Sequence, residues 1–208
     1  MSTAVSASSV SAAVRVAAEK GAITPLFSRR NERGQPPSAW FTWHAGILGP
    51  GVRVLDLASG PGRHALPAAE YGAEVVAVDS DAASLAVLER EAERRRLSVK
   101  CLHMDLRTSQ IAPASFDVVM LFGYLDRRRF ADFRAAVRPG GYFLAETFLT
   151  AQRQQGWGPE SDEHLLQPGE LVRLVAPFEV VLSREVIEMI DGRPAAIASV
   201  FAINTTGQ

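Results

Sequence analysis

A short glycine-rich stretch carries the residues whose types and spacing are best suited to ligand binding. Residues 60–65 fit the pattern Gly-x-Gly-x-x-Gly/Ala, in which glycines let the backbone approach a ligand and the start of the next helix offers unpaired N–H groups. Asp79 follows Gly60 by 19 residues, at the end of an apolar run, where a carboxylate can accept hydrogen bonds from both ribose hydroxyls. These features predict a nucleoside site and do not choose between NAD and another adenosine ligand.

Two further carboxylates narrow the choice of ligand. Asp56 lies inside the apolar run before the glycines, where a nicotinamide-binding strand normally has an apolar side chain. A buried carboxylate there needs a partner, which either the N–H groups of the glycine loop or a cationic ligand would supply. Asp105 ends a third apolar run, 26 residues after Asp79, where an adenine amino group could donate to it. We expect Asp56, Asp79 and Asp105 to line one site.

The elements that must position these residues alternate between strand and helix, with short links. This alternation is typical of βαβ units and a parallel sheet. The chain then ends with two consecutive strand-like runs around Asp191 and Gly192, a strong hairpin signal. We therefore predict an α/β fold: a doubly wound, Rossmann-like, seven-stranded sheet, mostly parallel, with a C-terminal antiparallel hairpin. The expected strands are 52–58, 74–79, 98–104, 116–122, 142–147, 178–190 and 195–203, and the expected helices are 63–71, 81–96, 129–137 and 169–175.

Length and composition suit one domain. The chain has 208 residues, a formal charge of −1 and one cysteine, Cys101. The balanced charge gives no general attraction to nucleic acid, and no apolar run approaches the ~18 residues of a membrane span. The single cysteine excludes an internal disulfide, the four histidines lack metal-ligand spacing, and the N-terminus lacks the features of a secretory signal. We expect a cytoplasmic protein with no metal, nucleic-acid partner or membrane contact; the oligomeric state stays open.

The domain organisation follows from the same pattern. We expect residues 1–35 to form an N-terminal tail with a short helix and a loop. Residues 36–208 are expected to form a single domain. It includes a lid helix at 36–48, which is rich in aromatic residues, and a substrate-side insert at 149–167.

Five motifs in a fixed order resemble those of the class I S-adenosylmethionine-dependent methyltransferases, over about residues 37–203. The Pro-Gly-Gly turn, the insert and the segment 165–171 are similar to small bacterial methyltransferases of the tellurite-resistance (TehB-like) type. Those relatives often have Tyr-Leu-His-Arg after the fourth strand, whereas this chain has Asp126 in place of the histidine, so no role of that histidine carries over. The motifs are residues 54–62, 78–79, 104–106, 116–119 and 138–141.

The resemblance implies S-adenosylmethionine as cofactor and S-adenosylhomocysteine as product. It implies that Asp79 holds the ribose, that Asp105 and Leu106 hold the adenine edge, and that the backbone at 58–60, supported by Asp56, faces the amino-acid end. The cofactor-binding residues implied are Asp56, Ala58, Ser59, Gly60, Gly62, Asp79, Ser80, Asp105, Leu106 and Leu121.

The resemblance also implies in-line methyl transfer to a small-molecule acceptor, in which the protein mainly aligns donor and acceptor and excludes water. A thiolate or chalcogen anion needs no base, whereas a hydroxyl or amine usually does. Tyr124 and Glu146 are candidate catalytic residues because the carboxyl ends of strands line the crevice of such sheets. Arg63 is a third candidate. Further acceptor-side candidates are Trp40, Trp43 and His44.

Two other functions stay open. A non-catalytic protein of this fold would bind the cofactor, to sense it or to bind a partner, without transferring the methyl group. A nicotinamide-dependent oxidoreductase would share the glycine loop and Asp79, but not Asp105 or the final hairpin. The identity of the acceptor and its reacting atom (S, Se, Te, O or N) are not determined by these residues.

Overall fold

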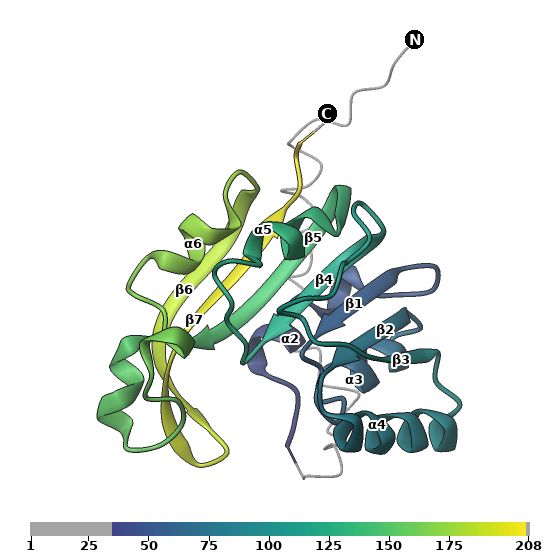
Figure 1. Ribbon diagram of the computed structural model, residues 1–208, viewed down its shortest axis with the longest axis horizontal. Helices are drawn as coiled ribbons and strands as arrows, with labels where there is room; N and C mark the ends of the chain where they lie inside the picture. The colour runs from purple at the N-terminus through teal and green to yellow at the C-terminus, as the bar shows by residue number, and fades with distance from the viewer. Residues whose placement is uncertain (1–34, 207–208) are drawn as a thin grey trace.

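Seven strands form one mixed sheet in the order β3-β2-β1-β4-β5-β7-β6 (Figure 1). The computed structural model describes residues 35–206, so the predicted tail helix and almost all of the predicted N-terminal loop lie outside the described residues. β1 to β5 run parallel, and β7 pairs antiparallel with both β5 and β6, which confirms the predicted fold. The strands are β1 (Arg53–Leu57), β2 (Glu74–Asp79), β3 (Val99–His103), β4 (Phe116–Phe122), β5 (Val137–Phe148), β6 (Glu179–Ile190) and β7 (Arg193–Ile203).

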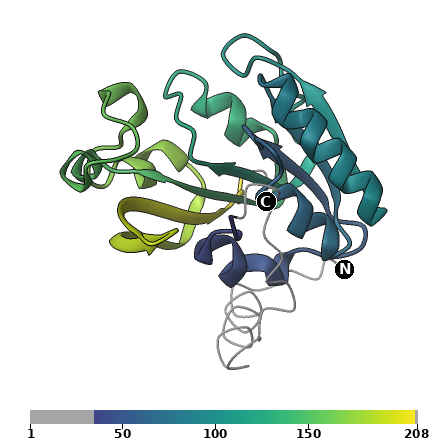
Figure 2. The same cartoon turned by 90° about the horizontal axis from the view of Figure 1, so that it is seen from below.

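Helices cover both faces of the sheet, because each strand of the parallel part alternates apolar side chains between two hydrophobic layers. Figure 2 shows α2 and α5 on opposite sides of the sheet. The helices are α2 (Ala39–His44), α3 (Ala65–Glu70), α4 (Ala82–Arg95), α5 (Phe130–Ala135) and α6 (Glu170–Val175), and the 3₁₀ helices are η1 (Ala45–Ile47), η2 (Thr150–Gln155) and η3 (Asp162–His164).

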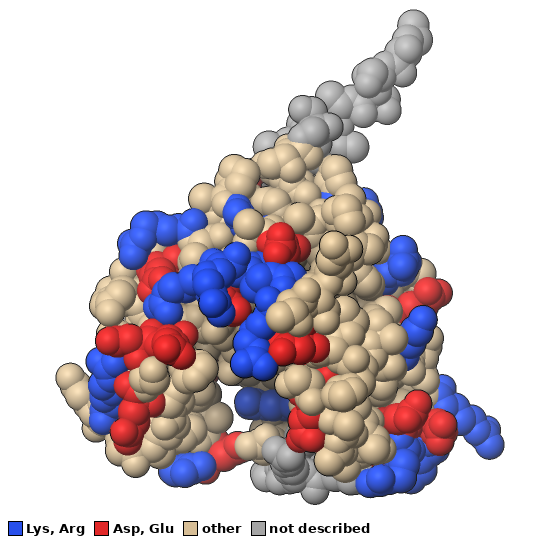
Figure 3. Space-filling model, in the orientation of Figure 1, with Lys and Arg blue, Asp and Glu red and all other residues tan. Residues whose placement is uncertain are grey.

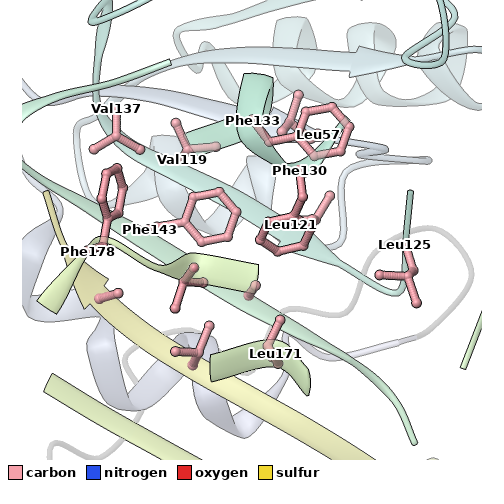
Figure 4. Close-up of a cluster of buried hydrophobic side chains, with 14 of the residues drawn as sticks. Leu57, Val119, Leu121, Leu125, Phe130, Phe133, Val137, Phe143, Leu171 and Phe178 are labelled. Carbon is pink, nitrogen blue, oxygen red and sulfur yellow. The ribbon is translucent and has the colours of Figure 1, made fainter. Parts of the chain in front are cut away.

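The two hydrophobic layers differ in the helices that they hold. One layer packs Phe130 and Phe133 of α5 and Leu171 of α6 against the sheet (Figure 4). The other packs α2, α3 and α4 against the opposite face and contains the fully buried Trp40 and Leu88. The glycine-rich stretch and the first carboxylate of β1 therefore lie on the side of α2 and α3.

The structure confirms one prediction of local structure, the C-terminal hairpin, and corrects another, the start of β5. Asp191 and Gly192 have φ values of 51° and 78°, as a tight two-residue hairpin turn requires, so the predicted hairpin is confirmed. The predicted start of β5 at residue 142 is wrong, because the strand begins at Val137. The Pro-Gly-Gly segment lies within the strand as an irregularity, where the pairing with β4 shifts register and Gly140 donates to the carbonyl of Asn204.

Across residues 35–206, none of the helices combines the length and the apolar character that crossing a bilayer requires.

Candidate functional site

The turn after β1 approaches its neighbours through the backbone. Ala58 and Gly60 have φ values of 55° and 53°, and the N–H of Ser59 donates to the carbonyl of Val78 at 3.0 Å. A Cβ atom built on Gly60 would meet no atom within 4 Å, so this part of the turn faces open space. The turn therefore offers backbone to a ligand, as the motif predicts.

Gly62 has a different role in the same motif. Its φ is 89°, and a Cβ there would overlap Cδ1 of Leu88 in α4 and lie 3.1 Å from Cγ of Leu66 in α3. Absence of a side chain at Gly62 lets the helix layer pack against the turn. Gly62 therefore has a packing role, and its predicted contact with a ligand remains a prediction.

Asp79 links the end of β2 to the glycine turn. Its Oδ2 accepts the N–H of Gly60 at 2.7 Å, and its Oδ1 accepts the N–H of Asp81 at 2.8 Å. The following residue, Ser80, is exposed, and its carbonyl contacts the ring nitrogen Nε2 of His103 at 3.0 Å. Each oxygen of Asp79 keeps a lone pair for a further donor, such as a ribose hydroxyl.

Two buried polar atoms beside the turn have no hydrogen-bond partner among residues 35–206: Oδ2 of Asp56 and Oγ of Ser59. Burial raises the pKa of the Asp56 carboxyl to about 8, and the nearby charge of Asp79 adds to this shift, while a backbone hydrogen bond from Ala65 opposes it. Unpaired buried polar atoms are costly, and they gather at functional sites. Oriented hydrogen-bond donors or a positive charge from a ligand would satisfy both atoms.

Asp105 follows β3 at the same edge of the sheet. The N–H of the adjacent Met104 donates to the carbonyl of Asp79 at 2.9 Å, so the carboxyl ends of β2 and β3 meet. Hydrogen bonds from Arg107, at 2.8 Å between Nη2 and Oδ2, hold the pKa of Asp105 down at about 2. Asp56, Asp79 and Asp105 thus lie at the ends of three neighbouring strands.

Two predicted contacts belong to the hydrophobic core. Leu106 and Leu121 are 4% and 1% exposed. Leu121 points into the cluster formed with Leu57 and Leu125 (Figure 4). Both side chains therefore pack in the core, and the predicted contact of these two residues with a cofactor remains a prediction.

The surface is hollowed at this edge. Figure 3 shows an opening between the part of the molecule that carries the insert and the hairpin and the part that carries β2, β3 and α4, with basic and acidic side chains alternating around it. Among the described residues, no group of three or more His, Cys, Asp or Glu side chains is placed to hold a metal ion.

Comparison with known proteins agrees with this geometry. Residues 54–141, which run from β1 into β5, match the family described as a methyltransferase domain. The fold resembles the crystal structure of TehB from Haemophilus influenzae, with a TM-score of 0.68 and 20% sequence identity over 79% of this chain and 61% of that chain. The chain is thus similar to methyltransferase domains over residues 54–141, and it has the same fold as TehB.

Two curated proteins that this chain resembles carry methyltransferase names. The chain is 30% identical over 149 residues to a ubiquinone biosynthesis O-methyltransferase of Methylocella silvestris, an alignment of 62% of this chain and 58% of the relative. It is 38% identical over 106 residues to a demethylmenaquinone methyltransferase of Thermus thermophilus, covering 46% of this chain and 47% of the relative. The chain therefore spans about half the length of these relatives.

The three residues predicted as catalytic separate into two groups. The charge of Glu146 acts on Arg63, together with that of Asp191 at the hairpin tip, so Arg63 and Glu146 lie near each other. Tyr124 lies on the other side, where its T-shaped partner is Phe133 and the charges that act on it include Asp105. Tyr124 is thus placed with the third carboxylate, and its predicted catalytic role remains a prediction.

The predicted lid helix is the short α2 continued by η1. Ser38 caps α2 by accepting the N–H of Phe41, and Trp40 is fully buried, with its Nε1 donating to the carbonyl of Val200 at 3.2 Å. His44 contacts the Trp40 carbonyl through Nδ1 at 2.8 Å, and burial lowers its pKa. Trp40 therefore anchors the helix. The exposed member of this aromatic group is Trp43.

The insert is fastened to the hairpin by residues that the sequence did not single out. The fully buried Gln152 accepts the N–H of Ala196 at 2.8 Å and donates to the carbonyl of Trp157 at 2.8 Å. The indole of Trp157 donates to the carbonyl of Pro194 at 2.6 Å. A second missed group is Ser199 with Arg184, both beside Glu146. The signal for Ser199 is a single hydroxyl in the otherwise apolar run 195–203.

Proposed function

We propose that this chain is an S-adenosylmethionine-dependent methyltransferase that acts on a small-molecule acceptor. The observation that carries the proposal is the pair of buried, unpartnered atoms, Oδ2 of Asp56 and Oγ of Ser59, next to the open face of Gly60. These atoms fit a ligand that brings both a positive charge and hydrogen-bond donors. The amino-acid end of S-adenosylmethionine is such a group.

The residues that would hold the cofactor follow the strand ends. The lone pairs of Asp79 would accept the ribose hydroxyls, and Asp105, with the backbone of Leu106, would contact the adenine edge. The backbone of 58–60 and Asp56 would face the amino-acid end. The bound cofactor supplies a methyl group on a sulfonium, which is already electrophilic. The chain's residues then have to orient the acceptor and exclude water.

The small-molecule acceptor is supported by the relatives. Both curated relatives named above carry names that refer to quinone compounds, and the charge of this chain is close to balanced, so its sequence offers no general attraction for nucleic acid. An acceptor would enter at the carboxyl ends of β4 and β5, beside Glu146 and Arg63.

Calorimetry tests the cofactor assignment. We expect S-adenosylhomocysteine to bind the purified chain and NADH not to bind. NADH binding without S-adenosylhomocysteine binding would contradict the proposal and favour an oxidoreductase.

A transfer assay tests the activity. Thiols, selenite, tellurite, phenols and amines are offered with S-adenosylmethionine, and release of S-adenosylhomocysteine is measured. We expect release with at least one of these acceptors. Cofactor binding without release for any of them would favour a non-catalytic protein that senses the cofactor.

A further inference from the structure

Glu146 presents one carboxylate oxygen that the chain leaves without a partner. It lies near the carboxyl end of β5 and is only 6% exposed. Its Oε2 accepts the Ser199 hydroxyl at 2.8 Å and Nη2 of Arg184 at 3.2 Å. Within residues 35–206, Oε1 accepts no hydrogen bond. The side chain is therefore held in one orientation by Oε2, with Oε1 available.

Arg184 is itself fixed from several directions. Its Nη1 donates to Glu188 at 2.8 Å, and its Nε donates to the Ser199 hydroxyl at 3.2 Å. Its guanidinium lies over the rings of Trp40, at 5.1 Å, and Trp43, at 4.7 Å. The fork of donors leaves little freedom to the Glu146 carboxylate, and the 61% exposed Trp43 adds a flat apolar surface beside it.

Arg63 faces the same region with donors to spare. Its Nε donates to the Pro36 carbonyl at 2.8 Å, which fixes the side chain, while no carboxylate of the described chain lies within ion-pair distance. Burial lowers its pKa, and the charges of Asp191 and Glu146 oppose that shift. The other arginine near the site, Arg184, is paired, so Arg63 is the cation available for an electron-rich acceptor.

We propose that the acceptor is an aromatic hydroxyl compound and that Oε1 of Glu146 is the general base for its hydroxyl; this inference rests on the proposed function. Arg184 and Ser199 are positioning residues, which hold the Glu146 carboxylate in place. The acceptor oxygen forms the bond to the methyl carbon, and the carbon–sulfur bond breaks with its electron pair passing to sulfur. The hydroxyl proton passes to Oε1 of Glu146. Arg63 stabilises the negative charge that develops on the acceptor oxygen.

The charges around Glu146 suit this role. Burial raises its pKa, and so does Glu188, whereas Ser199 and Arg184 lower it. The charges that face the pair are thus Arg184 and Glu188 from β6, Arg63 after the glycine turn, and Asp191 from the hairpin. A carboxylate whose pKa is moved toward the working pH is a more effective base than an ordinary exposed one.

The experiment compares two acceptors in wild type and Glu146→Gln. Phenol, whose pKa is about 10 like that of tyrosine, needs a base, whereas 4-nitrophenol is already ionised in mildly alkaline buffer. We expect Glu146→Gln to lower kcat for phenol by about 10²–10⁴-fold and kcat for 4-nitrophenol by less than about tenfold. Glu179→Gln, at an exposed glutamate of β6, is the control and is expected to change neither.

Two readouts separate catalysis from structure. Arg184→Met removes a positive charge, so the pH midpoint of kcat for phenol should rise; a purely structural role would leave the midpoint in place.

Quenching of tryptophan fluorescence by phenol, in the presence of S-adenosylhomocysteine, measures acceptor binding without turnover. The quenching should be equal in wild type and Glu146→Gln, and smaller in Trp43→Ala.

The outcomes are distinct from those of the proposed function. Equal losses of kcat for phenol and 4-nitrophenol in Glu146→Gln would overturn the inference. The inference would also be overturned if the wild type methylated thiophenol but methylated neither phenol nor 4-nitrophenol. The proposed function would stand in that second case. Absence of S-adenosylhomocysteine binding would remove both.

Discussion

Oδ2 of Asp79 accepts the N–H of Gly60 at 2.7 Å, although the two residues are 19 positions apart. The same carboxylate accepts the N–H of Asp81 through its other oxygen. One side chain at the end of β2 therefore fixes the turn after β1 and the entry to α4. It also keeps lone pairs for a ligand, so shape and recognition at this site depend on the same group.

Asp79→Ala should weaken binding of S-adenosylhomocysteine because the ribose hydroxyls lose a charged acceptor and the glycine turn loses its tether. The expected loss is about 2–3 kcal/mol, or roughly 30- to 150-fold in Kd. Calorimetry measures it. Asp132→Ala, at an exposed aspartate of α5 paired with Arg129, serves as the control. Unchanged affinity in Asp79→Ala would contradict the ribose assignment.

The placement of Asp56, Asp79 and Asp105 at one edge of the sheet was predictable because its signals are local. Each carboxylate closes or lies within an apolar run, parallel strands bring their carboxyl ends to one edge, and the spacing of Asp79 from Gly60 follows from one βαβ unit. Such arguments place backbone. They do not give side-chain burial: the side chain of Leu121 lies in the core, and the predicted contact of this residue with the cofactor remains a prediction.

The surroundings of Glu146 were not predictable because they are assembled by contacts between distant parts of the chain. Glu146 meets Ser199, 53 positions away, only because β7 pairs antiparallel with β5 in one register. Arg184 reaches the same carboxylate from the edge strand β6. The start of β5 was missed for another reason: Pro-Gly-Gly signals a turn, but the sheet accommodates it as an irregularity of the ladder.

Replacement of the two motif glycines should have different consequences. Gly62→Ala should lower the free energy of unfolding by about 2 kcal/mol or more, because its Cβ would overlap Leu88 at a positive φ. Gly60→Ala meets open space, so only the backbone strain of about 1–2 kcal/mol applies, and the larger effect should be on S-adenosylhomocysteine binding. Urea unfolding and calorimetry measure the two quantities. Equal destabilisation, with no difference in binding, would contradict the separate roles.

Asp56 should make stability depend on pH. Burial raises its pKa to about 8 in the folded chain, while the unfolded value is about 4. Between these values the folded chain holds a proton that the unfolded chain has lost, so this contribution to the free energy of unfolding falls as pH rises, by at most about 1.4 kcal/mol per unit. It is fully present below about pH 4 and lost by about pH 8.

Asp56→Asn removes that titration. Urea unfolding of both proteins at several pH values between about 5 and about 8 should show the variant gaining stability relative to wild type as pH rises. A difference between the two proteins that does not change with pH would mean that the Asp56 carboxyl is ionised in the folded chain over this range.

Arg127 should hold the insert in place. Its Nη2 donates to the Leu165 carbonyl at 2.7 Å, its Nη1 donates to the Asp162 carbonyl at 3.0 Å, and its Nε pairs with Glu170. Arg127→Met keeps the length of the side chain but removes every donor, leaving those carbonyls and the Glu170 carboxylate without their partner.

Hydrogen exchange of the amides in 160–170 should then accelerate by about tenfold or more, since each lost hydrogen bond to a charged group is worth about 1.5–3 kcal/mol. Arg128→Met is the matched control, because Arg128 is largely exposed and, within the part of the chain that the structure describes, its side chain pairs only with Asp126 of its own turn. Exchange that is equally slow in both variants would show that the buried Leu165, Leu166 and Gln152 fix the insert without Arg127.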